Sequence, residues 1–269
     1  MQMRLACLHY HQQASRLVCA KRDCYSRTIL GSIFLADPFR NLKLRWHRLM
    51  NTQIITLDGI RVHCGDTVPR AVRNGLFKNT YEDGEREMLK RCVRAGDKVL
   101  EIGGGIGFVG MAAAKIAGAG NVISYEANPR QKEVIEANYA LNSPVPELRM
   151  KAVTSDGEPV TFHQSDNVIS SSIYQRDEAQ TAITVPSDAL RDVLAEMRPD
   201  VVVMDVEGAE IELLADIDLS AVRAMVVELH PHIVGEEKIA ALLASLTAAG
   251  FEVSGDMRKN VLLTQAGAA

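Results

Sequence analysis

From Lys98 onward the sequence alternates between short apolar runs rich in β-branched residues and longer segments with helical periodicity. The runs with strand character are residues 99–102, 121–125, 147–152, 201–205, 224–229, 251–254 and 261–264. The helical segments are residues 107–117, 129–141, 187–197, 209–215 and 236–249. Uniformly apolar strands separated by helices are typical of a parallel sheet that is covered on both faces. The sequence therefore predicts an α/β fold.

Shorter segments precede and interrupt this pattern. Two apolar runs, residues 54–57 and 60–63, flank an Asp-Gly pair, which predicts a β-hairpin. Residues 82–94 have the spacing of a helix that ends at Ala-Gly. Residues 160–164 and 183–185 indicate an inserted ribbon around a polar loop. We expect the hairpin to be the entry to the main domain.

Charge is distributed unevenly along the chain. The whole sequence carries −4, but residues 1–50 hold nine basic and two acidic residues, so an arm of +7 precedes a body of −11. Residues 39–49 alternate loosely between apolar and basic, which is typical of a short amphipathic helix lying on the body or on an anionic surface. The whole-chain charge gives no reason to expect nucleic acid as the partner. We divide the chain into a basic N-terminal arm (1–50), a hairpin and connector (51–80) and a main domain (81–269).

Cysteine usage and hydrophobicity bear on the compartment. The five cysteines are odd in number and lack C-x-x-C spacing, which argues against a disulfide framework or a zinc site. No apolar run reaches the roughly 18 residues that span a bilayer, and polar residues interrupt the early apolar stretch, which makes a poor secretory signal. We expect a cytoplasmic protein without a transmembrane segment.

A glycine-rich turn, Glu101-Ile102-Gly103-Gly104-Gly105-Ile106-Gly107, joins the first main strand to its helix. Glycines let the backbone approach a ligand closely, and a helix N-terminus favours negative charge. The dinucleotide pattern G-x-G-x-x-G is absent, since Phe108 follows and the last glycine comes one residue early. Glu101 suits a ligand with an ammonium or sulfonium group. We therefore predict a ligand-binding turn that includes Glu101, Gly103, Gly105 and Gly107.

A second acidic residue, Glu126, ends the next strand about 20 residues beyond the glycines. A carboxylate in this place can accept both hydroxyls of a ribose, as in nucleoside-binding α/β folds. Consecutive strand ends meet at one crevice of an open sheet. The turn and Glu126 together therefore predict a nucleoside site.

These motifs resemble the class I S-adenosylmethionine-dependent methyltransferases, and more narrowly the FkbM-type family. The matching segments are residues 101–107, 125–129, 152–157, 170–172, 204–210 and 227–231, together with Asn138 and Asn142. The resemblance covers about residues 80–265 and leaves the first 50 residues outside. It implies a single Rossmann-like sheet of seven strands, mostly parallel with the last strand antiparallel, after an N-terminal helical and hairpin extension. It also implies methyl transfer from S-adenosylmethionine to a hydroxyl oxygen of a sugar, polyketide or similar metabolite.

The resemblance also assigns residues to the cofactor and marks two departures from the family pattern. The implied cofactor-binding residues are Glu101, Gly103, Gly105, Gly107, Glu126, Ala127, Asn128 and Ala152. Three glycines occupy the turn where Gly-Ala-Asn is common. Val203 stands where members often have a lysine, two residues before the aspartate of D-V-E-G. We expect cofactor binding to survive both changes, whereas the missing lysine affects proton transfer.

Methyl transfer to oxygen requires in-line alignment and removal of the acceptor proton. Asp205 follows one strand, and Glu228 and His230 follow the next, so all three are candidate catalytic groups. His230 is our first choice of base because of its pKa range, with Asp205 orienting it or the substrate. These residues with His232 would alternatively form an oxygen and nitrogen metal site, but we assign no metal. Candidate acceptor contacts are Ser171, Ser172 and Glu207.

The sequence thus favours an O-methyltransferase acting on a small hydroxylated metabolite or a glycan. An N- or C-methyltransferase of the same fold is the alternative among enzymes. A catalytically silent module that only holds the cofactor is the alternative from another class. Neither the identity of the acceptor nor the oligomeric state follows from the sequence.

Overall fold

The computed structural model describes residues 39–66, 68–164 and 181–267. The chain divides into two compact units, Met1–Phe39 and Arg40–Ala269, and the second is described below. Within the described ranges, no helix combines the length and the apolar character that crossing a membrane requires.

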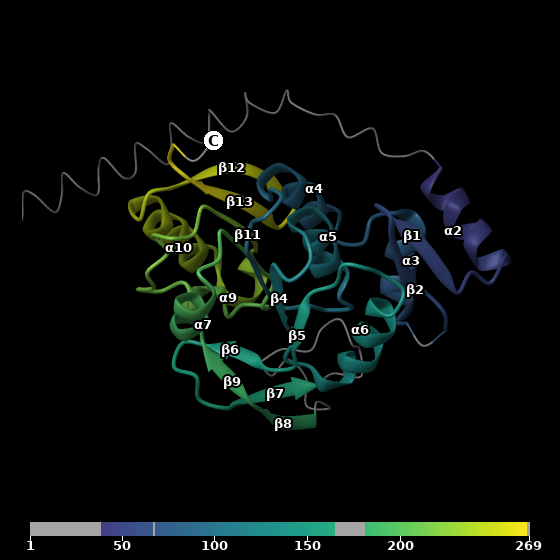
Figure 1. The fold of residues 1–269 in the computed structure, drawn as a ribbon, viewed down its shortest axis with the longest axis horizontal. Helices are drawn as coiled ribbons and strands as arrows, with labels where there is room; N and C mark the ends of the chain where they lie inside the picture. Colours follow the sequence, from purple (N-terminus) through teal and green to yellow (C-terminus); the bar gives the residue numbers. More distant parts are fainter. Residues whose placement is uncertain (1–38, 67, 165–180, 268–269) are drawn as a thin grey trace, which may run out of the picture. The chain divides into compact units, whose positions relative to one another are not determined.

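A seven-stranded sheet forms the centre of the second unit (Figure 1). Its order is β12 (Phe251–Met257), β13 (Asn260–Gln265), β11 (Ala224–Glu228), β10 (Val201–Met204), β3 (Val99–Ile102), β4 (Val122–Tyr125) and β5 (Glu147–Arg149). The strands from β11 to β5 are parallel, and β13 is antiparallel to β11 and to β12. The predicted mostly parallel sheet with a reversed last strand is confirmed.

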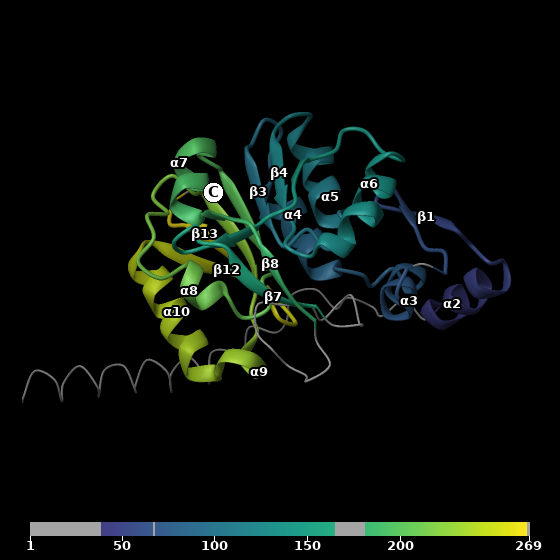
Figure 2. The same cartoon turned by 90° about the horizontal axis from the view of Figure 1, so that it is seen from below.

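Helices cover both faces of this sheet (Figure 2). One face packs against α7 (Leu190–Met197), α8 (Glu210–Leu213) and α10 (Glu236–Ala248), and the other against α4 (Asp83–Cys92) and α5 (Phe108–Ala117). Helix α6 (Lys132–Tyr139) follows the short helix η1 (Pro129–Gln131). Alternate residues of a strand point to opposite faces. Leu100 and Ile102 of β3 accordingly pack with the first group, and Val99 packs with the second.

The N-terminal part of this unit adds a third cluster of buried side chains. The predicted hairpin is present as β1 (Ile54–Leu57) and β2 (Ile60–His63). Helix α3 (Arg70–Lys78) lies in the segment for which only a connector was expected, and it buries Val72, Leu76 and Phe77. Helix α2 (Arg40–Leu49) packs on α3 through a ring stack of His47 on Phe77. Its opposite side exposes Leu42, Trp46 and Leu49.

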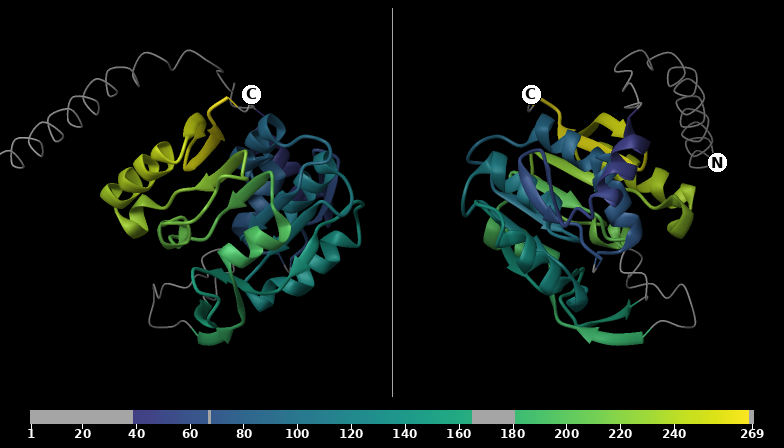
Figure 3. Two further views of the ribbon diagram at one scale, coloured as in Figure 1. Left: turned by 60° about the vertical axis from the view of Figure 1, so that its left-hand side comes forward. Right: turned by 90° about the vertical axis from the view of Figure 1, so that its right-hand side faces the viewer.

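Two predicted elements differ from the structure. The expected strand 147–152 is divided into β5 and a separate β6 (Ala152–Thr154), which pairs with β9 (Ser187–Ala189). The expected helix 187–197 therefore begins only at Leu190, because the preceding residues bond to β6. The predicted ribbon is present as β7 (Val160–Gln164) and β8 (Thr181–Val185), and it projects at the bottom of both views in Figure 3.

Candidate active site

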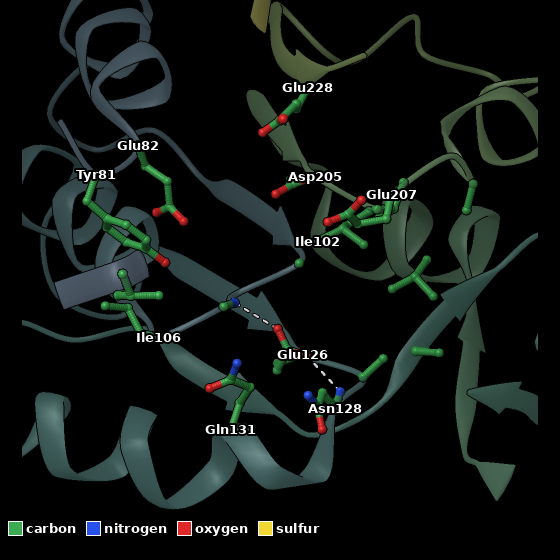
Figure 4. Close-up of a pocket in the computed structure, with 18 of the residues that line it drawn as sticks. Tyr81, Glu82, Ile102, Ile106, Glu126, Asn128, Gln131, Asp205, Glu207 and Glu228 are labelled. Atoms are coloured by element: carbon green, nitrogen blue, oxygen red, sulfur yellow. Dashed lines mark hydrogen bonds between the residues drawn. The ribbon is translucent and has the colours of Figure 1, made fainter. Parts of the chain in front are cut away.

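A cavity of about 470 Å³ lies at the carboxyl ends of β3, β4, β10 and β11 (Figure 4). Ligands of open α/β sheets bind in this place. One side, here called the glycine wall, consists of Gly103, Gly105, Glu126, Ala127 and Asn128. The other side, here called the acidic wall, consists of Asp205, Glu207 and Glu228. The two walls bring together the motifs that the sequence placed at consecutive strand ends.

Two glycines of the turn serve different purposes. A Cβ at Gly103 would overlap the carbonyl oxygen of Asp205, so this glycine allows the end of β10 to approach the turn. Gly105 has a φ of 55° and faces the cavity, where a Cβ would meet nothing closer than the Tyr81 hydroxyl at 3.6 Å. Gly105 therefore leaves backbone open to a ligand.

The Glu126 carboxylate is held by the backbone on both sides. Oε2 accepts a hydrogen bond from Gly105 N at 2.7 Å, and Oε1 accepts one from Asn128 N at 2.7 Å. The side chain is largely buried, and burial raises the pKa of Glu126 to about 7 despite these backbone donors. Each carboxylate oxygen has a further lone pair. Glu126 is thus a fixed acceptor at the edge of the cavity.

Glu101 and Gly107 do not line the cavity, in contrast to the expectation from the sequence. Glu101 shares the face of β3 that packs under α5, and it is 1% exposed. It accepts a hydrogen bond from the Ser124 hydroxyl, and burial raises its pKa to about 8. A Cβ at Gly107 would lie 2.7 Å from Cε1 of Tyr139, so that glycine permits the packing of α6. Both residues support the turn from behind.

The acidic wall collects carboxylates from two strand ends. Asp205 follows β10, and its backbone N–H bonds to the carbonyl of Ile102 at 2.9 Å. Glu228 is the last residue of β11, and Glu207 lies in the loop after β10 with a φ of 53°. Burial, followed by the charges of Glu228 and Glu207, raises the pKa of Asp205 well above its usual range. A group of neighbouring acids with a strongly shifted pKa, like this one, is typical of functional sites.

His230 lies behind the acidic wall instead of in the cavity. It is 1% exposed and does not line the cavity. Its Nε2 is 3.6 Å from Asp205 Oδ1, 3.6 Å from Glu228 Oε1 and 3.5 Å from Glu207 Oε2. In this arrangement a cavity ligand meets the carboxylates first. The expectation that His230 itself contacts the acceptor does not fit this position.

A fully buried carboxylate, Glu210, holds the loop that carries His230. Its Oε1 accepts the His230 backbone N–H at 3.0 Å, and its Oε2 accepts Gly208 N at 2.7 Å. Burial alone would raise the pKa of Glu210, but interactions with His230 and with the backbone outweigh it and lower the pKa. Glu210 therefore carries its charge beside the imidazole.

Several cavity residues were not predicted from the sequence, and three of them are polar side chains beside the acidic wall. Tyr81 and Glu82, from the connection between α3 and α4, face the acidic wall from across the cavity (Figure 4). Glu82 has a φ of 46°, which is costly for this residue type and often marks a functional position. Lys259, in the turn between β12 and β13, lies 3.2 Å from Glu228 Oε1. For these residues the only signal in the sequence is Glu82, an acidic residue just before a helical segment.

The remaining predicted residues fall into two groups. Ala127, Asn128, Ala152 and Glu207 line the cavity. Ser171 and Ser172 lie outside the described residues. Val203 is buried in the sheet, under α4 and α5.

Solved structures that match part of this chain include the ribosomal protein L11 methylase from Lactobacillus delbrueckii subsp. bulgaricus, with 17% identity and a TM-score of 0.40 over 66% of this chain and 74% of that one. Another is the Pyrococcus abyssi tRNA (uracil-54, C5)-methyltransferase, with 16% identity and a TM-score of 0.43 over 80% and 44% of the two chains. A comparison with curated proteins found no match.

A family model gives the more specific result. The model described as the methyltransferase FkbM domain matches residues 101–253, which is more than half of the 269 residues. The matched segment contains the glycine turn, Glu126 and all of the acidic wall. The chain therefore belongs to the FkbM family of S-adenosylmethionine-dependent methyltransferases.

Proposed function

We propose that this chain methylates a hydroxyl oxygen of a small metabolite, sugar or glycan. The observation that carries the proposal is that a single cavity joins the glycine wall to the acidic wall. The glycine wall offers backbone that no side chain covers and a fixed carboxylate. The acidic wall offers oxygen atoms that accept hydrogen bonds from hydroxyl groups. The acceptor and the methyl donor would thus meet between neighbouring strand ends.

The glycine wall fits S-adenosylmethionine, which supplies a methyl group on a positively charged sulfonium. Glu126 would accept the ribose hydroxyls through the lone pairs that its backbone donors leave open. Gly105 would face the cofactor without a side chain, and Ala127, Asn128 and Ala152 would line its path. Glu82, across the cavity, suits the positive charge of the cofactor.

The acidic wall would hold the acceptor and receive its proton. As the new carbon–oxygen bond forms and the carbon–sulfur bond breaks, the hydroxyl proton passes to a carboxylate. Asp205 is our choice, because it lines the cavity and lies next to the glycine turn. His230, behind Asp205 and Glu228, acts as a positioning residue in this proposal and not as the base.

The charge of the cavity supports a small neutral acceptor over nucleic acid. Five acidic side chains line it, from Glu82, Glu126, Asp205, Glu207 and Glu228, whereas Lys151 and Lys259 are the basic residues among the described lining. A wall of acidic side chains repels phosphate groups. The same side chains accept hydrogen bonds from hydroxyl groups. The same charge also favours a cationic amine, so N-methylation is the second candidate. For the compartment we propose the cytoplasm.

The test is a methyl-transfer assay with labelled S-adenosylmethionine and matched acceptors. Sugars and polyols are compared with amines of the same size, and the methyl position in the product is identified by NMR. O-methylated products that disappear with Asp205→Asn support the proposal. N-methylated products would replace it by the second candidate. Cofactor binding without transfer to any acceptor class would favour a silent binding module.

A further inference from the structure

Nε2 of the His230 imidazole faces three carboxylates at distances longer than an ordinary hydrogen bond. This nitrogen lies 3.5–3.6 Å from oxygens of Asp205, Glu207 and Glu228. An N–H···O bond is about 2.7–3.2 Å long. Ligand atoms that lie about 2.0–2.2 Å from one metal ion are roughly 3.0–3.6 Å from each other. The separations between Nε2 and these oxygens therefore match two ligands of one metal ion better than a hydrogen bond.

One buried oxygen in this group, Oδ1 of Asp205, has no hydrogen-bond partner in the part of the chain that the structure describes. It faces Nε2 of His230 at 3.6 Å, and the His230 side chain is 2% exposed. Because this oxygen is itself buried, bulk water does not compensate for the missing bond. An unpartnered carboxylate oxygen beside a buried ring nitrogen calls for a further occupant.

Glu210 places the imidazole as metal sites require. Its Oε1 lies 3.5 Å from Nδ1, on the side of the ring away from the acidic wall. Metal-binding histidines almost always face a carboxylate or carbonyl with the second ring nitrogen, which fixes the tautomer. With the proton on Nδ1, the lone pair of Nε2 points toward Asp205 and Glu228.

We propose that Asp205, Glu228 and His230 bind one divalent metal ion at the acidic wall. Their ligand atoms lie within 4.8 Å of one another. One imidazole and two carboxylates suit Mn²⁺, Fe²⁺ or Zn²⁺. The site deepens the proposed function and rests on it, because the ion neutralises the wall and holds the acceptor oxygen. Lys259, which contacts Glu228 at 3.2 Å, is half exposed and is able to turn into solvent.

Calorimetric titration of the full chain with Mn²⁺, after treatment with a chelator, tests the site. We expect one Mn²⁺ per chain, and at least a tenfold weaker affinity in Asp205→Asn and in His230→Gln. Glu252→Gln, which removes an exposed acid of β12, is the matched control and should leave the affinity unchanged. No saturable binding to the wild type, or an equal loss in the control, would overturn the inference.

A measurement on the unmodified chain covers the case in which the variants fail to fold. Paramagnetic Mn²⁺ should broaden the imidazole NMR signals of His230 before those of exposed histidines, whereas uniform broadening would contradict the site. The metal site and the proposed O-methylation are refuted by different results. Methyl transfer that persists in EDTA, with no Mn²⁺ bound, would contradict the metal site alone. Mn²⁺ binding without O-methylation would contradict the proposed function alone.

Discussion

The two walls of the cavity are held in different ways. On the glycine wall, Glu126 is fixed by two backbone donors at 2.7 Å, and the turn is shaped by glycines. On the acidic wall, one oxygen of Asp205 has no hydrogen-bond partner among the described residues, and carboxylates lie 3.5–3.6 Å from Nε2 of His230. The first wall is thus held in place before any ligand binds. The second gathers three acids from two strand ends, which suits the proposed binding of an acceptor or a cation there.

The largest effect is expected from Asp205→Asn, which removes a proton acceptor from the acidic wall. A positioned base contributes about 10²–10⁴-fold to the rate, so kcat should fall within that range. Affinity for S-adenosylmethionine should stay within a few-fold. The measurement is kcat with the best acceptor found, beside cofactor titration. A variant that keeps nearly full activity would show that another group takes the proton.

The next effect concerns the open backbone of the glycine wall. Gly105→Ala places a methyl group in the cavity opposite Tyr81 and should weaken cofactor binding about tenfold or more, which is 1.4 kcal/mol. Gly96→Ala is the matched control, because Gly96 also has a positive φ but has no atom within 4 Å of an added Cβ. Equal losses in both variants would point to backbone strain and not to cofactor contact.

Much of the glycine wall could be predicted from the sequence because its parts are local. A glycine turn after an apolar strand, and an acid at the end of the next strand, fix their own positions. The position of Glu101 behind the cavity could not be predicted, because the sequence does not show which face of β3 opens to the cavity. The burial of His230 depends on Glu210, and the place of Glu82 depends on a loop about twenty residues before the turn. Such long-range packing leaves no local signal.

The pH dependence of cofactor affinity further distinguishes the glycine wall from the acidic wall. Burial raises the pKa of Glu126 to about 7, so the carboxyl becomes protonated below that pH and loses its capacity to accept both ribose hydroxyls. Cofactor affinity should therefore fall as the pH drops from 8 to 6, by up to about tenfold per pH unit below 7. Asp205→Asn should retain this dependence and Glu126→Gln should lose it. An identical profile in Glu126→Gln would assign the titration to another group.

The smallest effect on binding is expected at Glu101, behind the glycine wall. Its pKa is about 8 in the folded chain and near 4.5 in a solvent-exposed state. The folded state therefore holds the proton more tightly, and the contribution to stability, complete below pH 4.5, is lost as the pH rises to 8. Glu101→Gln should reduce this slope by up to about 1.4 kcal/mol per pH unit in denaturant unfolding. An unchanged slope together with a large loss of cofactor affinity would restore Glu101 to the site.

The proposed division of roles places the cofactor on the glycine wall and the acceptor on the acidic wall. It is tested most directly by calorimetric titration of S-adenosylmethionine into the wild type, Glu126→Ala and Asp205→Asn. Glu126→Ala removes charge-assisted hydrogen bonds worth roughly 1.5–3 kcal/mol. Its affinity should fall about 10- to 150-fold, whereas that of Asp205→Asn should remain within a few-fold of the wild type. Unchanged affinity in a folded Glu126→Ala, or an equal loss in both variants, would contradict the assignment of the cofactor to the glycine wall.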